Sequence, residues 1–395
     1  MNESNAIAAI LASPEPDVRG SRYLGPNWYA SVMGTGIVAN AGALLPFDVP
    51  GLHVFCEVVW VGAATLLVAL VIATLAHWVR SPHVARTYGH DVQMAQFYGA
   101  PPMALLTVGA GAILAAKSMI GLGVAVDLDW VLWTLGTLTG LVSVTVIPYR
   151  LFTQIEVRPD AAFGGWLMPI VPPMVSAATG AILISHVASP LGRATLLYGC
   201  YMLFGMSLVA AMIIITLIWS RLAHFGSSQS GRVPTLWIVL GPLGQSITAA
   251  GTLGVEAHLA VPAQLAGAMS DFAVLYGLPV LGFALLWAVL ATALTVRTAR
   301  QHLPFSLTWW SFTFPVGVTV TGITRLALQT GLPALRWAAG VGFLILLGAW
   351  ILVAARTSLS TRHGGLFHHP TVGSTTPAAS KGRKSQVAAI TSTNA

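Results

Sequence analysis

Long apolar runs recur along the chain and are separated by short polar segments. A helix crosses the hydrocarbon core of a bilayer in about 20 apolar residues. On that criterion we predict ten membrane-spanning helices, at 27–45, 54–79, 97–117, 130–152, 166–187, 193–219, 234–253, 271–296, 306–328 and 333–355. The connections between them are too short to form a soluble domain, so the pattern predicts an all-α polytopic membrane protein.

A shared pattern separates the odd-numbered spans from the even-numbered ones. Each odd span has aromatic residues near its start, then Pro, then Thr and Gly. The prolines of successive odd spans lie 76, 71, 69 and 73 residues apart, and they are Pro26, Pro102, Pro173, Pro242 and Pro315. The period is about 72 residues, which is the length of one helical hairpin. The sequence therefore predicts five repeated hairpins.

Proline, threonine and glycine in the odd spans indicate where those helices lie. Proline inside a membrane helix frees a carbonyl and kinks the helix, which is tolerated where protein or a water-filled cavity satisfies the backbone. Small residues in a single span usually indicate tight packing, but their repetition in all five odd spans favours a pore. We expect a quasi-five-fold array of hairpins around a central pore. Its predicted lining residues are Thr35, Gly36, Pro102, Thr107, Pro173, Thr179, Gly180, Pro242, Thr248, Pro315, Thr321 and Gly322.

Composition and charge support a membrane protein and give its orientation. Charged residues are 8% of the chain and hydrophobic residues 55%, against about 25% charged in a soluble domain. With the N-terminus inside, 15 of the 19 basic residues lie on the inner side, and the others are Lys117, Arg193, Arg325 and Arg336. Basic residues are enriched in cytoplasmic segments. We therefore expect both termini in the cytoplasm and a location in the cell membrane. The net charge of +7 is a topology signal and does not indicate nucleic-acid binding.

The remaining segments and side chains add few functional signals. Residues 1–26 are expected to be a cytoplasmic lead, 27–356 the transporter domain, and 357–395 a disordered tail rich in Ser, Thr, Ala and Gly. We find no catalytic motif, no metal-ligand spacing and no nucleotide-binding loop, so we expect neither an enzyme nor a cofactor. Glu57 and Asp271 are candidate intramembrane acids, although their places near span ends favour solvated end residues.

Two short motifs resemble a known family. Residues 26–38 (PNWYASVMGTGIV) are similar to the first-helix signature of the tellurite-resistance/dicarboxylate transporter family, and residues 309–315 (WWSFTFP) resemble its ninth helix. That family includes fungal malate permeases, fungal sulfite efflux pumps and plant slow anion channels. The resemblance covers about residues 20–356. It implies a pore formed by the odd helices, a homotrimer in which each subunit has its own pore, and a plug at the ninth-helix Phe. That residue is Phe314 here, although Pro315 follows it where some members have Gly.

Two residues carry the functional prediction, and each has an alternative. Phe314 is either an apolar plug that blocks ions by dewetting or one of four neighbouring aromatics that pack at an interface, and the resemblance favours the plug. Arg325 either attracts anions at a pore mouth or anchors a helix end at the membrane surface.

We predict transport of a small anion, either a C4-dicarboxylate such as malate or an oxyanion such as sulfite. Expected partners are this substrate and membrane lipid. The alternatives are a passive chloride or nitrate channel, a membrane-embedded redox protein or enzyme, and a non-transporting sensor.

Overall fold

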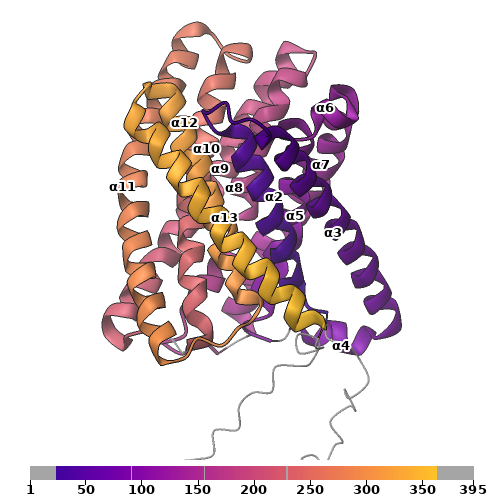
Figure 1. Ribbon diagram of the computed structural model, residues 1–395, viewed down its shortest axis with the longest axis vertical. Helices are drawn as coiled ribbons and strands as arrows, with labels where there is room; N and C mark the ends of the chain where they lie inside the picture. Colours follow the sequence, from indigo (N-terminus) through magenta and orange to yellow (C-terminus); the bar gives the residue numbers. More distant parts are fainter. Residues whose placement is uncertain (1–23, 90, 155, 228–229, 363–395) are drawn as a thin grey trace, which may run out of the picture.

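The computed structural model describes residues 24–362, except for 90, 155, 228 and 229. In this part of the chain the secondary structure is helical, and long helices alternate with shorter ones (Figure 1). The long helices are α3 (Leu52–Arg80), α7 (Leu122–Thr153), α9 (Pro190–Phe225), α11 (Ala263–Gln301) and α13 (Pro333–Arg362).

Each shorter helix follows a segment of 3₁₀ helix. The shorter helices are α2 (Tyr29–Leu44), α5 (Ala100–Leu114), α8 (Pro172–Leu183), α10 (Leu240–Glu256) and α12 (Phe314–Thr330). The 3₁₀ segments before them are η2 (Pro26–Trp28), η3 (Ala95–Gly99), η4 (Gly164–Leu167), η6 (Ser230–Val239) and η8 (Leu307–Phe312). Two small helices, α4 (Pro82–Thr87) and α6 (Lys117–Ile120), lie in connections between longer ones.

The repeated prolines mark helix starts, which corrects the expectation of kinks within the odd spans. Pro102, Pro173, Pro242 and Pro315 lie within the first three residues of α5, α8, α10 and α12, and Pro26 begins η2. The first N–H groups of a helix have no intrahelical partner, so proline loses nothing there. The last four prolines therefore lie at the change from 3₁₀ to α geometry, whereas Pro26 lies at the start of its 3₁₀ segment.

The short helices contact one another in chain order. Helix α2 packs against α5, α5 against α8, α8 against α10 and α10 against α12, and α12 returns to α2. Helices α3, α7, α9 and α11 each pack against the short helix that precedes them in the chain and the short helix that follows, and α13 packs against α12 and α2. In the most apolar stretch of Ser230–Leu259 94% of the residues are buried, against 22% in Pro333–Arg362. The short helices therefore form the interior, and the long helices surround them.

Helix lengths differ from the predicted spans. Among the described residues, eight helical segments are long and apolar enough to cross a membrane. The other two predicted spans, 27–45 and 166–187, correspond to α2 and α8, which have 16 and 12 residues. Helix α13 continues through residues 357–362, which we had assigned to the tail. Residues 1–23 and 363–395 lie outside the described part of the chain.

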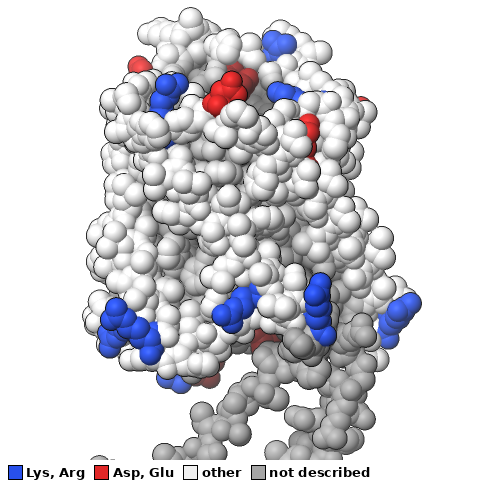
Figure 2. Space-filling model, viewed as in Figure 1, with Lys and Arg blue, Asp and Glu red and all other residues white. Residues whose placement is uncertain are grey.

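Basic side chains gather at one end of the molecule. Helices α3, α7, α11 and α13 each have an Arg in the last turn, namely Arg80, Arg150, Arg300 and Arg362. Figure 2 shows mostly Lys and Arg side chains along the lower end, with a few acidic atoms between them, whereas the upper end has acidic and basic side chains in similar measure. We call the lower end the basic end. It is the end that the sequence assigns to the cytoplasm.

Candidate functional site

Phe314 lies between two small cavities in the interior of the bundle. Its side chain is 2% exposed, and it borders both cavities. All five repeats contribute to each cavity, through the short helices, their 3₁₀ segments or, at Met168 and Val171, the residues between η4 and α8. One cavity uses residues early in these elements and the other uses later residues, so the two lie on opposite sides of Phe314 along the bundle.

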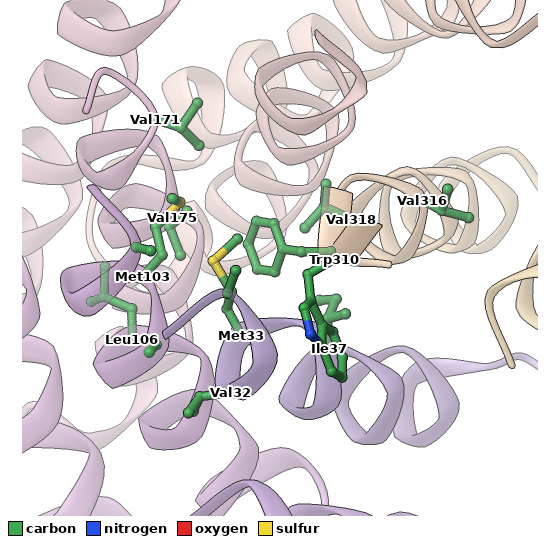
Figure 3. Close-up of a cluster of buried hydrophobic side chains, with 14 of the residues drawn as sticks. Val32, Met33, Ile37, Met103, Leu106, Val171, Val175, Trp310, Val316 and Val318 are labelled. Carbon is green, nitrogen blue, oxygen red and sulfur yellow. The ribbon is translucent and has the colours of Figure 1, made fainter. Parts of the chain in front are cut away.

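The cavity toward the basic end is mainly apolar, and we call it the Trp310 cavity. Its volume is about 20 Å³, and its lining includes Met33, Met103, Met168, Trp310 and Pro315. Figure 3 shows Met33 of α2 and Met103 of α5 among the buried apolar side chains here. At about 10–15 Å³ of such volume per water molecule, this cavity is no larger than one or two water molecules.

The cavity on the other side of Phe314 is more polar, and we call it the Arg325 cavity. Its volume is about 40 Å³, and Phe314 and Arg325 both border it. These residues are eleven positions apart on α12, or about 16 Å at 1.5 Å per residue. Between them the lining includes four of the predicted residues, Thr107, Thr179, Thr248 and Thr321.

The threonine hydroxyls in the Arg325 cavity already donate hydrogen bonds within the protein. Thr107 donates to the Met103 carbonyl at 2.6 Å, and Thr179 donates to the Val175 carbonyl at 2.9 Å. The Oγ1 atoms of Thr248 and Thr321 are 2.7 Å apart, with helix carbonyls as further acceptors. An anion needs donors. These hydroxyl groups would therefore bind an anion only after they rotate away from the carbonyls. The predicted threonines line the cavity, but their donors are already used.

Arg325 is the charged residue in the lining of this cavity. It is half-buried, and its Nε is buried without a hydrogen-bond partner. Glu256 is near enough to interact with it electrostatically, although no ion pair within 4.0 Å joins the two in the described part of the chain. A Cβ at Gly251 would lie 3.0 Å from the Arg325 Cβ, so this glycine gives the side chain room. Arg325 therefore retains donor capacity for an anion.

Several predicted lining residues face other helices instead. The Thr35 Oγ1 accepts a hydrogen bond from Trp350 Nε1 of α13 at 3.2 Å. A Cβ at Gly180 would lie 2.7 Å from Trp133 of α7, and one at Gly322 would lie 2.9 Å from the Gly244 carbonyl.

The other predicted lining residues also lie outside the two cavities. A Cβ at Gly36 would meet the Thr107 Cγ2 at 2.8 Å. Pro102 borders a separate lateral cavity, and Pro173 and Pro242 border neither interior cavity. These residues serve helix packing and helix starts.

Three polar residues that the sequence analysis missed line the Arg325 cavity. They are Asn40, Gln245 and Thr252, all at most 5% exposed. The Asn40 side chain donates to the Thr107 carbonyl at 3.0 Å, and its Oδ1 has no partner. In α2 the lining residues are Ile37, Asn40 and Leu44, which share one helix face. That spacing was visible in the sequence, but no motif drew attention to it.

A buried acid was also missed. Asp129 of α7 is fully buried, and neither carboxylate oxygen has a hydrogen-bond partner. A Cβ at Gly109 would lie 2.5 Å from Asp129 Oδ1, so the carboxyl group lies against α5.

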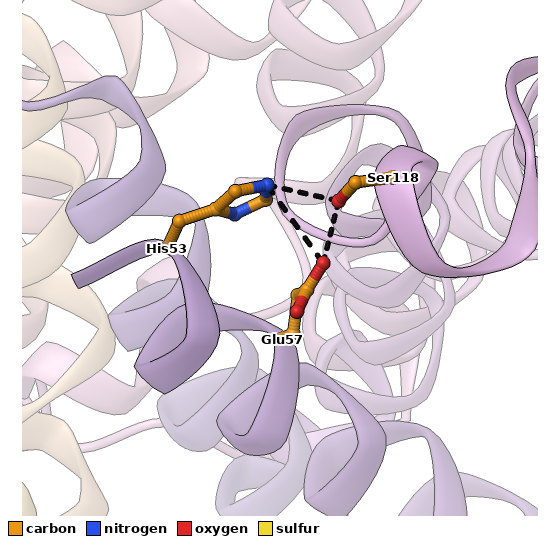
Figure 4. A network of polar contacts seen from close by, with 3 residues as sticks. All are labelled: His53, Glu57 and Ser118. Atoms are coloured by element: carbon orange, nitrogen blue, oxygen red, sulfur yellow. Dashed lines mark hydrogen bonds and ion pairs between the residues drawn. The ribbon is translucent and has the colours of Figure 1, made fainter. Parts of the chain in front are cut away.

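The two acids that the sequence singled out lie in different surroundings. Glu57 accepts a hydrogen bond from Ser118, whose Oγ is also 2.8 Å from His53 Nε2 (Figure 4). Asp271 is exposed. Glu57 thus connects α3 to α6 at the surface, away from both interior cavities.

The long apolar helices and the enclosed cavities among the short ones define a multi-pass membrane protein with a narrow polar interior. Residues 23–358 match the model of the voltage-dependent anion channel family (SLAC1). The chain belongs to this family, which confirms the resemblance seen in its two motifs.

Relatives of this chain carry transporter names. It is 25% identical over 338 residues to the sulfite efflux pump SSU1 of Arthroderma benhamiae, covering 84% of this chain and 89% of that protein. It is 26% identical to the protein of the same name from Arthroderma otae, with the same coverage of both chains. An uncharacterised transporter of Methanocaldococcus jannaschii is 22% identical, covering 86% of this chain and 96% of the relative. Together the family and these relatives support anion transport across a membrane, and they point to a transporter or channel and not to an enzyme.

Proposed function

We propose that the chain conducts a small anion along the axis of its short helices, past a gate formed by Phe314. The observation that carries this proposal is the position of Phe314 between two cavities that the same five helices line. One cavity contains Arg325, which attracts anions, and the other is apolar. A bulky ring at the boundary between them blocks ions by dewetting.

The proposed pathway uses the ten-span arrangement that the repeat suggests. In it, α2 and α8 also span the membrane, each completed by its 3₁₀ segment, and the five hairpins surround one pore. The closed order of contacts among the short helices supports this arrangement, as does the outer position of the long ones. A homotrimer with one pathway per subunit follows from the resemblance, and the mass of the detergent-solubilised complex measures it.

For the substrate we propose sulfite or an oxyanion of similar size. The relatives named sulfite efflux pumps support this choice, and so does the cavity. A C4-dicarboxylate carries two separated charges, whereas Arg325 is the one charged residue among the described residues that line the Arg325 cavity. A single guanidinium matches one compact oxyanion through paired hydrogen bonds.

Counterflow in proteoliposomes tests the proposal. Vesicles loaded with unlabelled sulfite, malate, succinate, nitrate or chloride are mixed with a labelled trace of the same anion. We expect accumulation with sulfite and little with malate or succinate. Strong exchange of malate would contradict the substrate assignment, and no exchange of any anion would contradict the function.

A passive channel is the second candidate, because the family description names a voltage-dependent anion channel. A channel gives discrete current steps in planar bilayers under an applied voltage, whereas a carrier exchanges the labelled anion without such steps. The same protein preparation in both assays therefore distinguishes the two.

A further inference from the structure

A large cavity opens between α3 and α7 near the basic end of the bundle, and we call it the α3–α7 cavity. Its volume is about 810 Å³. Its lining includes Thr74 and Trp78 of α3, Arg86 of α4, and Val142, Val146 and Arg150 of α7. It is separate from the two cavities beside Phe314, because none of its lining residues borders either of them.

The packing of the helices explains this cavity. Helix α3 packs against α2 and α5, and α7 packs against α5 and α8, but α3 and α7 share no extensive contact. The Tyr29 hydroxyl donates to Thr74 Oγ1 at 3.0 Å and holds α3 against α2. In Figure 1, α3 runs along one side of the bundle down to α4. The space beside it therefore remains unfilled by protein.

The depth of the cavity matches one leaflet of a bilayer. Its lining extends along α7 from Arg150 to Thr139, eleven residues or about 16 Å. The hydrocarbon core is about 30 Å thick, so this is about half of it. Along the wall, Val142 is 59% exposed and Val146 is 43% exposed. These apolar side chains face the outside of the bundle, where acyl chains lie.

The charge of the lining favours the binding of an anion where the cavity lies nearest the basic end. Arg86 and Arg150 border the cavity, and none of the described residues that line it is Asp or Glu. Arg150 Nη1 donates to the Gly89 carbonyl at 3.1 Å, which fixes the guanidinium, while Arg86 is exposed. Deeper in the wall, Ser143 is 5% exposed and its Oγ has no partner. Two guanidinium groups are suited to paired, charge-assisted hydrogen bonds with a phosphate.

A second lateral cavity provides a comparison within the same molecule. It lies between α7 and α9 near the other end, with a volume of about 960 Å³. Its lining includes Trp130, Leu141, Leu191 and Met202, and in the part of the chain that the structure describes no charged residue lines it. Both cavities can accept acyl chains, but the α3–α7 cavity alone of these two adds groups that bind an anion.

We propose that the α3–α7 cavity binds a phospholipid with an anionic headgroup. The acyl chains lie along Val142 and Val146, and the phosphate lies between Arg86 and Arg150. Basic pockets between membrane helices are suited to anionic headgroups. This proposal does not depend on the transported substrate.

Native mass spectrometry of the purified full-length chain in detergent tests this site. The protein is titrated with phosphatidylglycerol and with phosphatidylcholine that carries the same acyl chains. We expect tighter binding of phosphatidylglycerol. Arg86→Gln/Arg150→Gln is expected to weaken it by about tenfold or more while phosphatidylcholine binding stays unchanged. Unchanged phosphatidylglycerol binding in this variant would overturn the proposal.

Three controls make the result specific. Arg297→Gln/Arg300→Gln removes two basic residues from α11, outside the cavity, and an equal loss there would mean nonspecific attraction and overturn the site. Arg86 is exposed, and Arg86→Gln alone leaves the Arg150 bond to Gly89 intact, so its expected partial loss cannot come from breaking that bond. Millimolar inorganic phosphate should not displace the lipid, and displacement would assign the site to free phosphate.

Discussion

Phe314 is held in place by close contacts on the neighbouring helix. A Cβ at Gly34 would lie 2.6 Å from the Trp310 ring, and a Cβ at Gly317 would lie 2.5 Å from Ile37. Helix α2 therefore approaches η8 closely before Phe314 in the chain and α12 closely after it. These contacts explain why Gly34, which is part of the first-helix motif, and Gly317 are glycines.

Replacing Phe314 with Ala removes the ring between the two cavities. We expect anion flux in proteoliposomes to rise by about tenfold or more, because an open, wetted constriction conducts. The control is Phe312→Ala. Phe312 packs edge-on against Trp237 and Trp309 and borders neither interior cavity. Unchanged flux in a folded Phe314→Ala variant would assign Phe314 to packing.

Two substitutions test separately the charge of Arg325 and the paired donors of its guanidinium group. Arg325→Gln is expected to lower the apparent affinity for sulfite about tenfold or more, since a charge-assisted bond is lost. Arg325→Lys should recover part of the affinity, because the charge remains without the paired donors. Concentration dependence of uptake measures both, with Arg336→Gln, an exposed change on α13, as the control. Normal uptake by Arg325→Gln would return this residue to an anchoring role.

Asp129→Asn is expected to stabilise the protein. Both carboxylate oxygens of Asp129 are buried without a partner, and a buried amide is less costly than an unpaired carboxylate. The gain should be about 1–3 kcal/mol, measured as the shift of the unfolding curve in detergent. A loss of stability would mean that this carboxyl group makes a contact that the fold requires.

The spacing between each repeat proline and its threonine shows which lining residues the sequence predicts and which it does not. From the repeat proline to the threonine there are 5 to 6 residues at Thr107, Thr179, Thr248 and Thr321, and all four line the Arg325 cavity. The corresponding distance from Pro26 to Thr35 is 9 residues. Three extra residues turn a side chain by about 60° on a helix, and Thr35 faces α13 instead. The neighbouring glycines were misassigned because adjacent helical residues point about 100° apart.

At the scale of the helices, glycine sets how closely the interior packs. A Cβ at Gly244 of α10 would lie 2.5 Å from the Thr319 backbone nitrogen of α12. The backbone of α12 cannot move aside as the end of a flexible side chain can. The repeat predicted the hairpins, but not which glycine meets which backbone, because that depends on contacts between residues far apart in the chain.

Gly244→Ala therefore tests the contact between α10 and α12. We expect it to destabilise the protein by about 2 kcal/mol or more, because the added methyl group collides with backbone. Gly241→Ala on the same helix is the matched control, since a Cβ there meets nothing within 4 Å. Gly241→Ala should be neutral or stabilising. Equal unfolding curves for both variants would contradict the close approach.

The 3₁₀ segments were not foreseen for a similar reason. Aromatic and small residues before each proline were read as the start of a membrane helix. In the structure, a Cβ at Gly99 would collide with the Met168 carbonyl group, and one at Gly164 with that of Thr235. Segments η3, η4 and η6 therefore approach one another through their backbones, a tertiary contact that local sequence does not reveal.

At the scale of the whole molecule, the basic end gives a topology that can be tested. His83→Cys lies at the basic end, and Gly123→Cys lies near the start of α7 at the other end; both positions are exposed. The native Cys56 and Cys200 are buried and should not react. We expect a membrane-impermeant maleimide to label Gly123→Cys in intact cells and His83→Cys only after permeabilisation. The reverse pattern would invert the topology.

The difference in length between the two sets of helices has a mechanical consequence. Bilayers of different thickness are accommodated by tilt of the helices that face the lipid, and here those are the long ones, with 29 to 39 residues. The constriction at Phe314 depends instead on contacts among the short helices. We therefore expect the pathway to respond little to lipid chain length, and the molecule to work alike in thin and thick membranes.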